Sequence, residues 1–114
     1  MTPEGKVKKE VKRILEAYKP LVSGRWPVQN GMGLPMLDYV GCCCGLHFEI
    51  ETKKDFKQDL TPRQELTKEE TEAAGGKVFV VKGVTVSDTA ELEEWLHRTV
   101  MQHKKKFNNL SLKV

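Results

Sequence analysis

The chain has 114 residues, the length of a single domain, and leaves no room for a second independent core. Apolar residues make up 39% and charged residues 31%, which is typical of a polar folded domain, and the net charge of +3 permits a polyanionic partner without demanding one. The sequence contains no apolar run near the ~20 residues of a membrane span and no secretory signal, so we expect a cytoplasmic protein with no membrane partner.

The N-terminal half predicts one helix and two or three strands. Residues 6–19 predict an amphipathic helix that ends at Pro20, because apolar residues recur there at spacings of three and four: Val7, Val11, Ile14, Leu15 and Tyr18. Residues 21–37 are rich in glycine and proline, which predicts an irregular connection with a short strand near residues 26–29.

Residues 37–43 and 46–53 predict a hairpin with a tight turn at Cys44–Gly45. The second strand alternates, so that His47, Glu49, Glu51 and Lys53 share its polar face. If the strands pair about that turn, residues whose numbers sum to about 89 lie opposite each other. This register sets Asp38 across from Glu51.

The second half predicts two helices and one strand. Thr61, Pro62 and Gln64 form a helix-start pattern, and Gly75-Gly76 ends that helix, which has few large apolar residues and is expected to be partly exposed. Residues 78–82 predict an interior strand covered on both faces. Asp88-x-x-Glu91 opens a last helix over 87–106. The apolar stripe of this helix is expected to be Leu92, Trp95, Leu96, Thr99, Val100 and His103. The tail at 107–114 suits either an edge strand or a subunit contact.

This order, α-β-β-β-α-β-α, predicts an α/β fold with a small mixed sheet of about four strands flanked by helices. The three cysteines are contiguous at 42–44, so they suit neither a disulfide framework nor a zinc site. We expect them to be small apolar residues of a protein in a reducing compartment.

Asp38, Glu51 and Lys53 form the constellation best suited to chemistry. Two opposed carboxylates repel each other unless a cation lies between them, and hard oxygen ligands select Mg²⁺, Mn²⁺ or Ca²⁺. The backbone carbonyl of Thr52 could add a ligand, and the Lys53 ammonium could orient water or stabilise charge during phosphodiester hydrolysis. From spacing alone, a solvated charged strand face remains the alternative interpretation.

Five segments of the sequence resemble, in order, a known family: Gln29-Asn30-Gly31, Leu37 to Cys42, Gly45 to Lys53, Leu60 to Gln64, and Ala74 to Val81. They are similar to VRR-NUC nuclease domains of the PD-(D/E)xK superfamily, in particular the stand-alone phage proteins, over roughly residues 6–83. The resemblance implies a restriction-endonuclease-like core. Relatives usually carry proline directly before the aspartate, whereas here Leu37 precedes Asp38 and the proline is Pro35.

The resemblance also implies roles for individual residues. Asp38 and Glu51 would be metal ligands for Mg²⁺, with Mn²⁺ as a substitute, and Lys53 would be the catalytic lysine. Gln64 would approach the site from the following helix, although it could simply cap that helix. Glu10 would complete the site from the first helix, although it could be a solvated residue at the edge of the apolar stripe.

Nucleic-acid contacts are expected from basic residues near this constellation: Lys54, Lys57, Arg63, Lys9 and Arg13. Ordinary solubility is the alternative explanation for them, and His47 and Glu49 are peripheral residues that could touch metal or phosphate.

We therefore expect a divalent-metal-dependent DNA nuclease of low or structure-selective specificity, acting on branched or duplex DNA. A homodimer would place two active sites on opposite strands of the DNA. The expected compartment is the host cytoplasm if a phage encodes the protein. The alternatives are a non-catalytic nucleic-acid-binding module of the same fold and a small interaction protein.

Overall fold

A computed structural model describes residues 1–29 and 31–112, with side chains described as far as residue 107. Four strands form one sheet in the order β1-β2-β3-β4, in which β3 and β4 are parallel and the other neighbours antiparallel. The predicted α/β class and element order are confirmed; the elements are α1 (Pro3–Ala17), β1 (Val22–Arg25), β2 (Tyr39–Cys43), β3 (Leu46–Thr52), α2 (Pro62–Ala73), β4 (Lys77–Val81) and α3 (Val86–Leu112).

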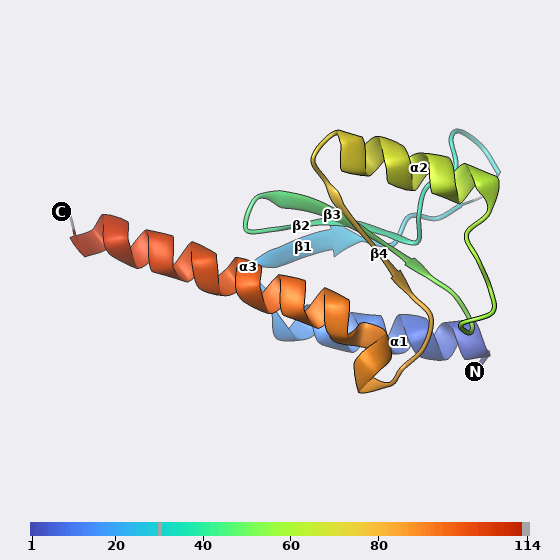
Figure 1. Ribbon diagram of the computed structural model, residues 1–114, viewed down its shortest axis with the longest axis horizontal. Helices are drawn as coiled ribbons and strands as arrows, with labels where there is room; N and C mark the ends of the chain where they lie inside the picture. The colour runs from blue at the N-terminus through green and yellow to red at the C-terminus, as the bar shows by residue number, and fades with distance from the viewer. Residues whose placement is uncertain (30, 113–114) are drawn as a thin grey trace.

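The sheet lies between two layers of helix, with α1 and α3 on one face and α2 on the other (Figure 1). Phe48 and Ile50 of β3 are fully buried in the core that the sheet shares with α1 and α3. Trp95 of α3 packs against Phe48 and Phe79, with ring centroids 5.2 and 5.5 Å away. The other face of β3, which carries the charged residues, is therefore turned toward α2.

The β2–β3 hairpin fixes the register that matters for the site. Cys44 and Gly45 both have positive φ, 52° and 86°, which is the geometry of a two-residue type I′ turn. Tyr39 pairs with Ile50, so Asp38, one position earlier, lies opposite Glu51. The predicted turn and register are confirmed.

Element boundaries in the N-terminal half differ from the prediction: the first helix ends at Ala17, and the hairpin strands are Tyr39–Cys43 and Leu46–Thr52. The helix predicted at 6–19 begins at Pro3, because the Thr2 hydroxyl accepts a hydrogen bond from the Gly5 amide at 3.0 Å and caps it. The short strand predicted near residues 26–29 was wrong: β1 lies at Val22–Arg25. Pro27 lacks an amide donor for the ladder, whereas Val22 is buried and pairs with Cys43.

The strand predicted at 78–82 runs from Lys77 to Val81 and stands last in the strand order, so its predicted interior position was wrong, whereas its predicted covering on both faces is confirmed. Val78 and Phe79 point to opposite faces and are both buried, because α2 and α3 cover the two sides of β4. A continuous apolar run therefore reports covered faces and not the number of neighbouring strands. The exposed character predicted for α2 is confirmed, since none of its residues is buried.

The last helix begins at Val86 and not at an Asp88-x-x-Glu91 cap. Thr85 and Asp88 form the capping pair: the Asp88 amide donates to Thr85 Oγ1 at 3.2 Å, and the Thr85 amide donates to Asp88 Oδ2 at 3.1 Å. His103, predicted on the apolar stripe, is exposed.

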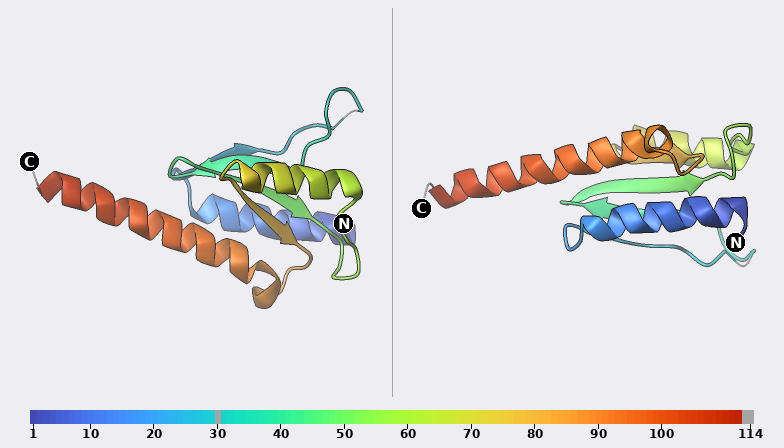
Figure 2. Two further views of the ribbon diagram at one scale, coloured as in Figure 1. Left: turned by 45° about the horizontal axis from the view of Figure 1, so that its top comes forward. Right: turned by 90° about the horizontal axis from the view of Figure 1, so that it is seen from below.

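The helix α3 continues through most of the predicted tail and runs beyond the sheet (Figure 2). The edge-strand alternative is therefore wrong as far as Leu112. Residues 113–114 of the predicted tail, and Asn30 of the first matching segment, lie outside the described residues. Within the described part of the chain, no helix has the length and apolarity to cross a bilayer.

Candidate active site

Hydrogen bonds from backbone amides connect Asp38 and Glu51 at the open end of the β2–β3 hairpin, opposite its turn. The Asp38 amide donates to Glu51 Oε1 at 3.1 Å. Thr52 holds the other carboxylate, because its amide and its hydroxyl both donate to Asp38 Oδ2, at 2.9 and 2.7 Å. Thr52 is fully buried, so this contact is shielded from water. The two acidic residues therefore lie side by side on adjacent strands, as the register predicts.

Lys53 and Gln64 complete this cluster. Gln64 Nε2 donates to Glu51 Oε2 at 2.8 Å, and Gln64 Oε1 accepts from Lys53 Nζ at 2.8 Å. Lys53 Nζ also lies 3.6 Å from Glu51 Oε2, and both residues are only 4% exposed. The structure thus brings together four of the five predicted catalytic residues, with Thr52 between them.

The first turn of α2 positions Gln64. Its amide donates to Thr61 Oγ1 at 3.2 Å, and its side-chain Oε1 accepts from the Thr61 amide at 2.9 Å, which is the predicted capping box. The same Oε1 accepts from Lys53. Gln64 therefore both caps α2 and contacts the acidic pair, two roles that were predicted as alternatives.

Burial, and after it the neighbouring Asp38 carboxylate, raise the pKa of Glu51 from its ordinary value to about 7. The hydrogen bond from the Asp38 amide and the Lys53 ammonium act against this rise. Burial and a like charge therefore both disfavour the ionised form of Glu51. A cation placed between the two carboxylates would relieve that repulsion.

Glu10 is not drawn into the cluster by a hydrogen bond. It is bound to Arg13, whose guanidinium lowers the pKa of Glu10 and also lies 4.0 Å from Glu93 of α3. Arg13 is therefore engaged with two carboxylates on the α1–α3 side. The predicted roles of Glu10 in catalysis and of Arg13 in DNA binding stay predictions.

Lys8, and not its neighbour Lys9, is the α1 residue that reaches the acidic pair. Lys8 Nζ lies 3.8 Å from Asp38 Oδ1, and its side chain is 38% exposed. The sequence places Lys8 in the basic part of the helix without singling it out. Its position next to the buried stripe residue Val7 is the only sequence signal that could have indicated it.

His47 and Glu49 lie on the same face of β3 as Glu51, as predicted, but their contacts lead away from it. Glu49 Oε2 lies 2.7 Å from His47 Nε2 and accepts from the Thr71 hydroxyl of α2 at 2.9 Å. Glu49 is 8% exposed, so this second carboxylate on the strand is enclosed under α2. It ties the sheet to the helix.

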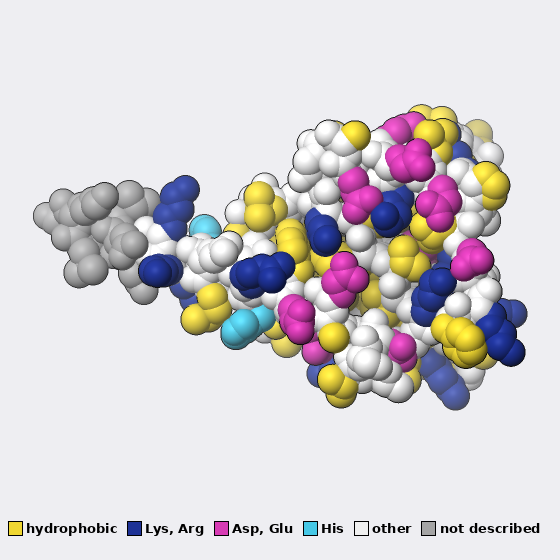
Figure 3. All heavy atoms as spheres, in the orientation of Figure 1, with side chains coloured by type: hydrophobic (Ala, Val, Ile, Leu, Met, Phe, Trp, Pro, Cys, Tyr) yellow, Lys and Arg dark blue, Asp and Glu magenta, His cyan; other side chains and the backbone are white. Residues whose placement is uncertain are grey.

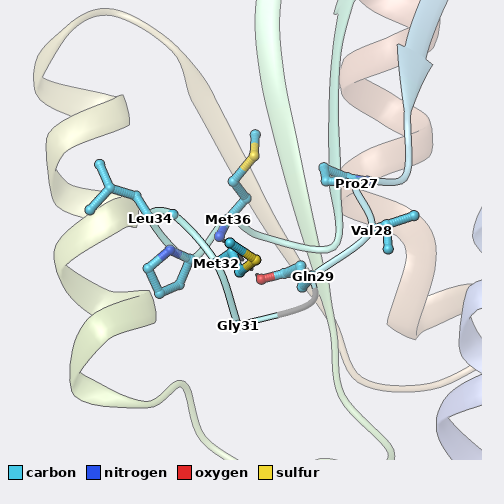
Figure 4. Close-up of a pocket in the computed structure, with 9 residues that line it drawn as sticks. Pro27, Val28, Gln29, Gly31, Met32, Leu34 and Met36 are labelled. Atoms are coloured by element: carbon cyan, nitrogen blue, oxygen red, sulfur yellow. Dashed lines mark hydrogen bonds between the residues drawn. The ribbon is translucent and has the colours of Figure 1, made fainter.

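The loop between β1 and β2 leads directly into Asp38. It surrounds a depression of about 310 Å³ whose lining includes Gln29, Leu34 and Met36 (Figure 4). Gln29 Oε1 accepts from the Met36 amide at 3.2 Å, which closes the loop on itself. Leu34 is 79% exposed, so the loop presents apolar surface next to the site.

Charge is distributed unevenly around the cluster. The α2 segment carries four glutamates against two cations, and acidic side chains gather over it in Figure 3. The α1 segment carries five cations against three glutamates, and basic side chains gather at the end of the molecule near its N-terminus. Lys54 and Lys57 belong to the loop that follows β3, whereas Arg63 lies in the first turn of the acidic α2.

Among the described residues, no group of three or more His, Cys, Asp or Glu side chains is arranged to hold a metal ion. The cluster offers the two carboxylates of Asp38 and Glu51, and the carbonyl of Thr52 stays a predicted ligand. Carboxylate oxygens suit hard cations such as Mg²⁺ and Mn²⁺. The thiols of Cys42, Cys43 and Cys44 are free, and they are exposed, buried and half-buried in turn.

The mixed four-stranded sheet and its flanking helices define an α/β domain that is consistent with a restriction-endonuclease-like fold. A solved structure described as a VRR_NUC domain superposes on this chain with a TM-score of 0.65 and 28% sequence identity, covering 80% of this chain and 97% of that one. No family model and no curated protein matches the sequence. The predicted resemblance to VRR-NUC domains is thus confirmed, and the chain has a VRR-NUC-type fold.

Proposed function

We propose that the chain is a divalent-metal-dependent DNA nuclease that hydrolyses phosphodiester bonds. The likeness to a VRR_NUC domain supports a nuclease-type domain. The observation that carries the proposal is the buried Lys53 ammonium beside the opposed carboxylates of Asp38 and Glu51. Three charged groups are costly to gather at a partly buried site, and such clusters are typical of catalytic centres.

The acidic pair fits a magnesium ion. Asp38, Glu51 and the Thr52 carbonyl would hold it, with Mn²⁺ as a substitute. Mg²⁺ usually keeps several waters and binds through one or two carboxylates together with substrate phosphates, so a third protein carboxylate is not required. When bound, a divalent cation supplies the Lewis acidity that polarises a phosphate and acidifies water.

Lys53 acts on the phosphate and not on the fold alone. Its ammonium is fixed by Gln64 Oε1 at 2.8 Å and keeps further N–H donors for a ligand. A preorganised ammonium stabilises the negative charge that develops on phosphorus during hydrolysis, or orients the attacking water. Gln64 is a positioning residue in this scheme, because it holds both Glu51 and Lys53.

The charge distribution supports an approach of DNA over α1 and the loop after β3. Lys8, Lys9, Lys54 and Lys57 would contact phosphates there, whereas the acidic surface of α2 would repel them. Arg63 is the one predicted DNA contact on the acidic helix. A preference for branched DNA and a homodimer with sites on opposite strands are finer parts of this proposal.

The test compares wild-type protein with Lys53→Ala on labelled duplex and branched DNA, with Mg²⁺, with Mn²⁺ and with chelator. We expect the wild type to cut only with the cation, and Lys53→Ala to bind DNA but lose cutting by at least 100-fold. Lys19→Ala is the matched control, since Lys19 is exposed and paired with Glu16. Binding without cutting by the wild type under all conditions would support the non-catalytic module instead.

A further inference from the structure

An exposed aromatic ring lies in the loop that follows the strand of Glu51. Phe56 lies in the loop that connects β3 to α2, three residues after Lys53, and is 77% exposed. Its sequence neighbours, Asp55 and Lys57, are both charged, so the ring is an isolated apolar group and not part of a continuous apolar stretch. Nothing in the packing of the core explains a phenylalanine at this position.

The loop is preformed and holds the ring in a turn. The Gln58 amide donates to the Asp55 carbonyl at 3.3 Å, and the Lys57 amide donates to Asp55 Oδ1 at 2.9 Å. Gln58 Oε1 accepts from the Lys54 amide at 3.0 Å and ties the turn to the end of β3. Phe56 and Lys57 therefore occupy the two central positions of a closed turn.

The turn follows Lys53, which lies beside Glu51 of the acidic pair, after two residues. Three residues of extended chain span at most ~11 Å, which is the upper limit for the distance between the Cα atoms of Lys53 and Phe56. Lys57 Nζ lies 5.9 Å from the centroid of the Phe56 ring, so a phosphate-binding cation accompanies the aromatic face. The two loop acids are engaged elsewhere: Asp55 holds the turn, and Asp59 pairs with Lys82 at 3.4 Å.

We propose that Phe56 stacks on a nucleobase beside the phosphodiester that the nuclease cuts, and that Lys57 holds the phosphate of the same strand. The proposal rests on the proposed nuclease function and adds a residue that determines substrate choice. Stacking needs a base whose face is free, so the site prefers DNA in which a base next to the cut is unpaired or easily unstacked. Because every base has such a face, the preference is for structure and not for sequence.

A nucleobase fits this ring better than a protein partner does. Protein interfaces are built around contiguous apolar patches, whereas this ring is flanked by charged residues and followed by Lys57. Aromatic rings interleaved with cations are the usual arrangement of single-strand binding surfaces. The loop also continues directly from Lys53, so the ring belongs to the chain segment that leaves the site.

The direct test uses fluorescence of 2-aminopurine, a base analogue that is quenched when it stacks. Oligonucleotides carry it unpaired at each position around the mapped cut, and they are mixed with Lys53→Ala protein, which is expected to bind without cutting. We expect quenching at one or two adjacent positions, and loss of that quenching in the Lys53→Ala, Phe56→Ala double variant. Phe107→Ala is the matched control, because Phe107 is 64% exposed on the distant part of α3. Unchanged quenching without the Phe56 ring would overturn the proposal.

A cleavage assay separates failure of this inference from failure of the proposed function. The substrates are a fully paired duplex and the same duplex with one unpaired base at the cut. We expect Phe56→Ala to lower cutting of the second substrate by about 5- to 100-fold, from the usual strength of base–aromatic stacking, with Phe56→Trp active and Phe56→Leu impaired. If the wild type cuts neither substrate, the nuclease function fails; if Phe56→Ala cuts both like the wild type, only the stacking inference fails.

Discussion

The side-chain amide of Gln64 donates to the carboxylate of Glu51 at 2.8 Å, and this contact joins the start of α2 to the acidic pair. Gln64 Oε1 serves two donors at once, the Thr61 amide and the Lys53 ammonium. The capping box of the helix and the orientation of the catalytic candidates therefore depend on one side chain. Disturbing that side chain should affect stability and chemistry by separable routes.

Gln64→Glu separates the two routes. Glutamate also forms capping boxes and is favoured near a helix N-terminus, so we expect the free energy of unfolding to change less than in Gln64→Ala, which should lose about 1 kcal/mol. The new carboxylate faces Glu51 without a donor, so cutting should fall at least tenfold in both variants. Urea unfolding and initial cleavage rates measure the two effects, with the exposed Gln102→Ala as control. Equal cleavage rates of Gln64→Glu and wild type would show that Gln64 has no positioning role in cutting.

The opposition of Asp38 and Glu51 could be predicted because it depends on local rules. The glycine of a type I′ turn sets the register, and the two-residue period of the strand sets the face. The capping role of Gln64 follows from its spacing to Thr61 in the same way. These features require knowledge of neighbouring residues only.

The contacts that the sequence did not indicate depend on packing between distant segments. Lys8 reaches Asp38 because α1 crosses the sheet at the end where β2 begins. The hydroxyl of Thr52 reaches Asp38 because Asp38 lies just before β2 begins. Outside the strand, the alternation of side chains between the two faces no longer applies. The edge position of β4 was missed for a related reason: apolar runs report burial, and helices bury a strand as well as other strands do.

Thr52→Val tests whether the buried hydroxyl positions Asp38. The substitution removes the 2.7 Å hydrogen bond from Oγ1 but keeps the backbone donor and nearly the same volume. Losing a buried hydrogen bond to a charged acceptor should lower the free energy of unfolding by about 2 kcal/mol and weaken Mn²⁺ binding about tenfold or more. Urea unfolding and calorimetric titration measure these effects. The control is Thr99→Val on α3, a threonine that is 6% exposed and should leave Mn²⁺ affinity unchanged.

Lys8→Ala and Lys9→Ala distinguish a residue at the acidic pair from one further along the basic helix. Lys8 lies 3.8 Å from Asp38 Oδ1, so its ammonium is placed to contact the phosphate that the carboxylates approach. We expect Lys8→Ala to lower the cutting rate at saturating DNA more than Lys9→Ala does. Each variant should lessen the salt dependence of DNA binding by about one counterion if its lysine contacts a phosphate. An identical cutting rate in the two variants at saturation would contradict a special position for Lys8.

The raised pKa of Glu51 predicts a pH-dependent stability. In the folded protein this pKa is about 7, against a reference value of 4.5, so between these two pH values the native state binds more protons than the unfolded state. The free energy of unfolding should therefore fall as pH rises from 4.5 to 7, by about 3 kcal/mol if no cation is present. Urea unfolding at pH 5 and pH 8 in chelator measures the fall. It should be absent in Glu51→Gln, which cannot ionise, and a fall of equal size in that variant would assign it to another group.

Adding Mn²⁺ should reverse this trend if the cation binds where the proton does. Protons and metal ions compete for the same carboxylate, so the rise in melting temperature caused by a fixed Mn²⁺ concentration should be small at pH 5.5 and larger at pH 8. Glu51→Gln should show a weaker stabilisation that no longer changes across pH 7, because the titrating ligand is gone. The same titration on Glu49→Gln is the matched control, since Glu49 lies on the same strand face but is bound to His47 and Thr71. A stabilisation by Mn²⁺ that is independent of pH in the wild type would place the cation away from Glu51.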